Sequence, residues 1–235
     1  MKKKIATIIA VVLLSFSQLK AQLNEIGINV GLVASRYTVG ENFPNDFTII
    51  SQGRISTGYT AGAQWMIGPP RDQKLPYLKL EHAMMVEANF GRIGGNINFQ
   101  TRPSGNTKPT SNELTFVNYQ VDVAAMYMAK LNRFYMLIGA GVTNHLFRGV
   151  KVGAANEFRS ANNQLNEFYF SSMIGVGAKI DRFLVTGRYQ LALTEFGKPT
   201  ALIPTDINSH QLRIGVAYFL IEKHRGKNWG SIYYD

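Results

Sequence analysis

Seven charged side chains share one alternation of the predicted strands, an alternation that otherwise holds small polar residues. They are Lys79, Glu81, Glu87, Asp122, Lys179, Arg188 and Arg213. Two opposite unit charges about 4 Å apart attract by roughly 4 kcal/mol at an effective dielectric near 20. Desolvation offsets much of that attraction when the pair is buried. If these strands enclose a narrow interior, we expect the charges to meet across it as a network that orders side chains, without a pocket for acid–base catalysis.

Two of the four histidines could belong to a second kind of site. His145 and His210 fall at strand ends that lead into long segments, and Asp206 and Ser209 lie close to His210 in sequence. A serine, a histidine and an aspartate at the rim of a barrel would suit a lipid-modifying enzyme. No spacing requires these groups to converge, so we expect them to be polar loop residues and the protein to be non-enzymatic.

Composition excludes several further classes of chemistry. The chain has no cysteine, which excludes disulfides, thiolate metal sites and a lipid-modified N-terminal cysteine. No metal-spaced cluster or phosphate-binding loop is present, and GAGV at 139–142 has no helix after it. We therefore expect no cofactor and no metal. The net charge is +10 with four lysines among the first 20 residues, and no dense basic run predicts nucleic-acid binding.

Eight segments alternate between apolar and polar residues with the period of a β-strand. They are 24–34, 55–67, 77–91, 116–129, 134–144, 166–180, 183–193 and 210–221. The connections alternate between short joins and long polar segments, the latter at 35–54, 92–115, 145–165 and 194–209. An even number of antiparallel strands with short turns at one end and long loops at the other is typical of an outer-membrane β-barrel.

The two alternations differ in a way that indicates which one faces inward. One carries aliphatic and aromatic residues, and the other carries glycine, serine, threonine, asparagine and glutamine with the few charges above. Small polar residues suit the crowded interior of about eight strands, whereas aqueous channels need about sixteen. The sequence predicts an eight-stranded antiparallel transmembrane β-barrel with a filled polar lumen. His82 falls on the lipid-facing alternation, which a neutral imidazole or a local bulge would explain.

The chain divides into three predicted parts: a signal peptide at 1–21, the barrel at 22–221 and a periplasmic tail at 222–235. The first part has three lysines, a short apolar run and a small residue, Ala21, before the expected cleavage site. The tail is basic and then aromatic. Its candidate partner-binding residues are Trp229, Ile232, Tyr233 and Tyr234, since tryptophan and tyrosine dominate binding hot spots. A frayed tail or one that caps the barrel is the alternative.

Two stretches resemble a known family. LKLEHAMMVEANFG and FVNYQVDVAAMYMAKLNRFYMLIGAGV are similar to the small outer-membrane β-barrel family of Gram-negative bacteria that includes PorT-like proteins. The resemblance implies an eight-stranded barrel. It also implies an accessory role in type IX secretion for some members, and it brings no catalytic residues. The basic-aromatic tail departs from the usual ending of the family.

Together these features predict a non-enzymatic protein of the bacterial outer membrane that serves as a structural or accessory subunit of an envelope complex. Protein secretion or outer-membrane assembly is the expected process. The expected partners are outer-membrane lipid and other envelope proteins, bound through the tail or the loops, and no nucleic acid. A lipid-modifying enzyme at the extracellular rim and a soluble lipocalin-like binding protein remain the alternatives.

Overall fold

The computed structural model describes residues 23–39, 47–51, 54–67, 81–101, 110–131, 134–153, 157–161, 165–197 and 207–222. Its strands are β1 (Leu23–Val39), β2 (Phe47–Ser51), β3 (Ser56–Ile67), β4 (Glu81–Thr101), β5 (Thr110–Leu131), β6 (Phe134–Val152), β7 (Arg159–Ser160), β8 (Phe168–Ile180), β9 (Phe183–Ala192) and β10 (Ile207–Glu222). Among these residues, no helix is long and apolar enough to span a bilayer.

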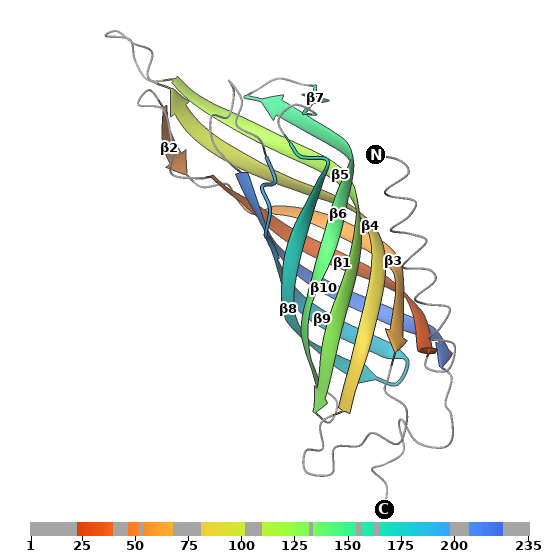
Figure 1. Ribbon diagram of the computed structural model, residues 1–235. Helices are drawn as coiled ribbons and strands as arrows, with labels where there is room; N and C mark the ends of the chain where they lie inside the picture. Colours follow the sequence, from red (N-terminus) through yellow and green to blue (C-terminus); the bar gives the residue numbers. More distant parts are fainter. Residues whose placement is uncertain are drawn as a thin grey trace, which may run out of the picture.

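Eight of the strands close into a ring (Figure 1). Around the ring the order is β1, β3, β4, β5, β6, β8, β9 and β10, and the pairing of β1 with β10 closes it. Every pairing is antiparallel, and every strand of the ring pairs with its neighbour in sequence. The prediction of an eight-stranded antiparallel barrel is confirmed.

The barrel turns its apolar alternation outward. Leu32 on β1 is 72% exposed, whereas Arg213 on β10 is 2% exposed. Aromatic residues on the same outward alternation include Phe90, Phe134 and Phe183, all exposed. A water-soluble barrel would have the opposite arrangement, because its apolar residues would fill the interior. Exposed apolar side chains around a closed barrel are the arrangement of a membrane-spanning one.

Three neighbouring strands run well beyond the rest of the barrel. β4 has 21 residues and β5 has 22, against 10 for β9, and a membrane-spanning strand needs about 9–11. In Figure 1 the ends of β4, β5 and β6 project together, with β2 and β7 beside them. The predicted loop 92–115 is therefore largely wrong: residues 92–101 and 110–115 continue the hairpin and pair up to Thr101 and Thr110.

The segment 145–165 is likewise only partly a loop. β6 continues to Val152, and the chain then returns so that Arg159 pairs with Val150. The sequence analysis did not extend these strands, because the apolar residues change from the outward to the inward alternation beyond the membrane. The outward residues there become polar. The inward residues there are apolar and buried, among them Ile97, Leu114 and Phe116.

Short turns gather at one end of the barrel and long connections at the other. β8 ends at Ile180 and β9 begins at Phe183, and Asp181 between them has a φ of 51°. Aspartate is one of the few non-glycine residues that adopt this left-handed conformation readily. In outer-membrane barrels the short turns face the periplasm and the long loops face outward, so the projecting ends of β4, β5 and β6 belong to the extracellular side.

The lumen is filled in three layers. Its extracellular layer is apolar and consists of Tyr37, Ile97, Leu114, Phe116, Val150, Ala161, Leu165, Tyr169, Ala192, Phe196 and Ile207. Its periplasmic layer is apolar and rich in methionine, with Met66, Ala83, Met85, Ala124, Met126, Met128, Tyr135, Leu137, Met173, Leu184, Ala217 and Phe219. The charged residues Glu87, Asp122, Arg188 and Arg213 lie between these layers. The sequence predicted the polar filling but neither apolar layer.

Candidate functional site

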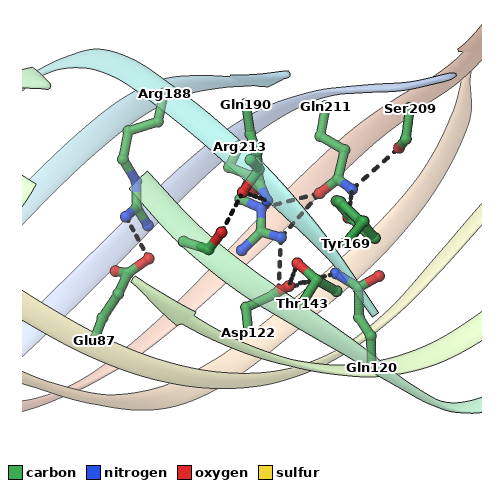
Figure 2. Close-up of polar contacts among 12 residues, drawn as sticks. Glu87, Gln120, Asp122, Thr143, Tyr169, Arg188, Gln190, Ser209, Gln211 and Arg213 are labelled. Carbon is green, nitrogen blue, oxygen red and sulfur yellow. Dashed lines mark hydrogen bonds and ion pairs between the residues drawn. The ribbon is translucent and has the colours of Figure 1, made fainter. Parts of the chain in front are cut away.

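Two ion pairs cross the middle of the lumen (Figure 2). Arg213 Nη2 on β10 lies 2.6 Å from Asp122 Oδ2 on β5, and Arg188 Nη1 on β9 lies 2.5 Å from Glu87 Oε1 on β4. All four side chains are buried. In each pair the two strands are four places apart in both directions around the ring. The pairs therefore join opposite walls of the barrel.

Asp122 is the centre of a hydrogen-bonded cluster. Gln120 Nε2 donates to both of its carboxylate oxygens, at 2.8 and 3.0 Å, and the Thr143 hydroxyl donates to Oδ1. Gln211 Oε1 accepts hydrogen bonds from Arg213 at 2.9 and 3.2 Å, and its Nε2 donates to the Tyr169 hydroxyl at 2.8 Å. Buried charges are stable where most of their hydrogen-bonding positions are filled in this way, and here Arg213 Nη1 alone of the pair's polar atoms has no partner among the described residues.

The Glu87 pair is less completely satisfied. Arg188 Nη1 contacts Glu87 and lies 3.4 Å from Met126 Sδ, while Glu87 Oε2 and Arg188 Nε have no partner among the described residues. A cavity of about 10 Å³ lies beside the two arginines, with Asn29, Gln64 and Thr186 among its lining residues. That volume accommodates about one water molecule. The space beside the two arginines therefore has no room for a solute larger than water.

The two arginines lie directly opposite each other on adjacent strands. Arg188 and Arg213 form a cross-strand pair in the β9–β10 register. Like charges in that position repel each other, so each arginine needs its own carboxylate. On the facing wall, Glu87 and Asp122 lie on the neighbouring strands β4 and β5, which supply one carboxylate to each arginine.

A third ion pair lies at the periplasmic mouth. Lys179 Nζ is 2.6 Å from Glu25 Oε1 and 4.8 Å from the centre of the Phe219 ring. Glu25 is buried, and it was not among the predicted network residues. It shares the inward alternation of β1 with Gly27 and Asn29, so its parity could have identified it. β1 has register irregularities at this end, between Leu23 and Glu25 and between Ile26 and Gly27.

The remaining predicted residues are placed only in part. Lys79 lies outside the described residues, and for Glu81 and His82 the structure describes only their backbone positions on β4. The tail residues Trp229, Ile232, Tyr233 and Tyr234 also lie outside the described residues.

The histidines and Ser209 do not gather into one site. Ser209 is buried in the lumen, where its hydroxyl accepts a hydrogen bond from Gln211 at 3.3 Å. The adjacent His210 points to the outer surface, where Nδ1 lies 2.6 Å from the Tyr189 hydroxyl and Nε2 lies 3.1 Å from the Thr38 hydroxyl. His145 is buried inside the barrel, with Nδ1 2.8 Å from the Asn166 carbonyl. Ser209 and His210 therefore face opposite sides of the same strand.

The ion pairs of the lumen join opposite walls of the barrel. Glu87 and Asp122 are paired with Arg188 and Arg213 between the two apolar layers, and within the described ranges no three histidine, aspartate or glutamate residues group as metal ligands. The fold is that of a small outer-membrane β-barrel. This assignment rests on the ring of strand pairings and on the outward apolar surface.

Comparisons with known proteins find similarity in structure only. No protein-family model matches the chain, and no curated protein matches it. Ail of Yersinia pestis is 13% identical, with 84% of this chain and 99% of that chain covered at a TM-score of 0.41. Neisserial surface protein A is 10% identical, with 82% and 96% covered at 0.44. OprG of Pseudomonas aeruginosa is 9% identical, with 84% and 96% covered at 0.41.

Proposed function

We propose that the protein is a non-enzymatic, integral component of the bacterial outer membrane that acts as a structural or accessory subunit of an envelope complex. The observation that supports this most is the filled lumen. Two ion pairs join opposite walls between two apolar layers. A barrel filled in this way supports no diffusion of solutes, so its function must lie at its surfaces and ends.

The process served by the complex is proposed from the resemblance to PorT-like barrels. Protein secretion of the type IX kind is the leading process, and outer-membrane assembly is the second. Two parts of the chain offer contacts to a partner. One is the extracellular projection of β4, β5 and β6. The other is the tail, whose Trp229, Tyr233 and Tyr234 have the residue types of binding hot spots.

Affinity purification of the tagged full chain from cross-linked, detergent-solubilised outer membranes tests the proposal. We expect a stoichiometric envelope protein to co-purify. A variant with W229A, I232A, Y233A and Y234A should lose it, and a control with K223A and K227A, which keeps the aromatic residues, should retain it. Absence of any stoichiometric partner would contradict the accessory role. Retention of the partner by the aromatic variant would exclude docking through the tail.

The non-enzymatic part of the proposal has its own test. His210 is the histidine beside Ser209 in the predicted rim site. Its side chain lies on the outer surface, whereas the Ser209 side chain is buried in the lumen. We expect H210A to leave the composition of outer-membrane lipids unchanged, by mass spectrometry of extracted lipid, relative to a strain that expresses the unmodified chain. A lipid species that depends on His210 would contradict this part.

A further inference from the structure

A groove lies on the outer surface of the barrel, away from the lumen. It has a volume of about 380 Å³ and is lined by Tyr59, Arg92, Val117, Tyr119, Phe147 and Phe158. These residues come from β3, β4, β5, β6 and the segment that returns after β6. Arg92 is directly opposite Tyr59 on one side and Tyr119 on the other in the strand registers. A single cationic group is thus flanked by two tyrosines in an otherwise apolar groove.

A β-bulge builds one wall of the groove. The pairing of β5 with β6 shifts between Tyr119 and Gln120, so that Leu146 and Phe147 are both exposed on the outside although they are consecutive. The Phe147 ring thereby lies 6.0 Å from the Tyr119 ring, which stacks 6.3 Å from Phe90. Bulges recur where a side chain must be redirected at a functional surface. Without this one, Phe147 would point into the lumen.

Arg92 marks the upper limit of the apolar band on β4. The outward residues before it are Met84, Val86, Ala88 and Phe90, and those after it are Gly94 and Asn96. An arginine on the lipid side costs roughly 2–4 kcal/mol at the bilayer midplane and about 0–1 kcal/mol near the interface. Arg92 therefore lies at the level of the headgroups, beside the aromatic residues that belong at that level.

No described residue neutralises the charge of Arg92. Among the residues that the structure describes, the ion pairs involve Arg188, Arg213 and Lys179, and none involves Arg92. The planar guanidinium matches a phosphate through two parallel hydrogen bonds. The apolar walls formed by Val117, Phe147 and Phe158 suit an acyl chain rather than a hydrated small anion.

We propose that this groove binds a phosphorylated lipid of the outer leaflet, with the phosphate on Arg92 and an acyl chain along the Tyr119–Phe147 wall. The bound lipid would cover β3 to β6 directly below the extracellular projection. Lipid binding at this groove requires neither a protein partner nor the lumen network. A test of the groove therefore does not depend on the accessory role.

Native mass spectrometry of the refolded full chain in neutral detergent tests the site. The probes are dioleoyl phosphatidic acid and dioleoylglycerol, which differ only in the phosphate. We expect the unmodified chain to retain phosphatidic acid in preference, R92Q to bind it about tenfold more weakly, and R92K to fall between them because lysine keeps the charge but loses the paired donors. R182Q, which removes an exposed arginine at the short-turn end, should bind like the unmodified chain.

Each contrary outcome overturns the proposal. Equal binding of the two lipids would exclude recognition of the phosphate. Equal affinity of R92Q and the unmodified chain would exclude Arg92 as the residue that binds the phosphate. Displacement of the lipid by inorganic phosphate at the same concentration would show that the apolar wall contributes nothing to lipid binding. Heat-modifiable migration of each variant on gels confirms that it is folded, so that weak binding reports the groove itself.

Discussion

Arg213 on β10 and Asp122 on β5 are 91 positions apart in sequence and stand on opposite walls of the barrel, yet their side chains approach to 2.6 Å. Glu87 and Arg188 repeat this relationship on the two strands next to them. A barrel whose walls were held only by neighbouring strands could change its cross-section. The two pairs oppose such a change, because each fixes a distance across the diameter.

Asp122→Asn should destabilise the barrel strongly. The substitution leaves Arg213 buried without its counter-charge and places an amide where Gln120, Thr143 and Arg213 all donate. Breaking one partner of a buried pair costs about 3–5 kcal/mol. The free energy of unfolding in urea, measured in lipid vesicles, checks this.

The control is Asp181→Asn, which removes the same charge from an exposed turn and keeps a residue that tolerates its positive φ. We expect it to be nearly neutral. If both substitutions had the same small effect, the lumen pair would contribute nothing to stability.

Glu87 and Arg188 should be energetically coupled. Glu87→Gln alone leaves Arg188 facing Arg213 across the β9–β10 pair. The same substitution in an Arg188→Gln background removes a carboxylate that no longer has a partner. A double-mutant cycle should therefore give a coupling energy of about 0.5–3 kcal/mol. Since Asp122 accepts hydrogen bonds from three residues and Glu87 from one, we expect Glu87→Gln to cost less than Asp122→Asn. Additive effects in the cycle would contradict the coupling.

Phe196→Ala should loosen the extracellular layer of the lumen. Phe196 follows β9 and is buried, with its ring 4.7 Å from the Tyr37 ring, 5.0 Å from His145 and 5.6 Å from Tyr169. Truncation of a buried phenylalanine costs about 3–5 kcal/mol. The exposed Phe158 is the matched control, and its truncation should cost far less. Thermal unfolding in detergent distinguishes the two, and equal losses would show that Phe196 does not hold the layer together.

Gly95→Ala should be destabilising because of a close approach between two strands. A Cβ at Gly95 would overlap the ring of Tyr37, whose hydroxyl accepts a hydrogen bond from Asn118 Nδ2 at 3.0 Å. Overpacking of this kind typically costs about 1–3 kcal/mol. Gly187→Ala is the control, since nothing lies within 4 Å of a Cβ at that position. A stable Gly95→Ala variant with an unchanged Tyr37 environment would contradict the packing described.

The strands and their inward faces were predictable from sequence because strand periodicity carries that information locally. The alternation around Glu87, for example, separates Met84, Val86 and Ala88 from the lumen residues without any knowledge of the fold. The apolar layers were not predictable in the same way. Met85 and Met126 lie on the inward alternation. Only closure of the ring shows that such inward residues from different strands meet in two apolar layers with polar residues between them.

The partners within the lumen network depend on the shear of the barrel, which a single sequence does not encode visibly. Asp122 with Arg213 was one of several possible pairings of the predicted charges. Glu25 was missed although its place on the inward alternation of β1 could be read from the sequence, and the register of β1 is irregular around it. The outward position of Phe147 depends on a bulge, and alternation counted along the chain places that residue on the wrong face.

The apolar alternation of the strands faces lipid, and the polar alternation faces a filled lumen. Since the chain has no cysteine, single nitroxide labels can be placed at Leu212, Ile214 and Val216 and at the inward Gln211 and Ala217, and their collision with oxygen and with a water-soluble nickel complex measured in lipid nanodiscs. We expect high oxygen and low nickel accessibility at the three outward positions and low accessibility to both reagents at the two inward ones. Water-accessible labels at the outward positions would contradict it.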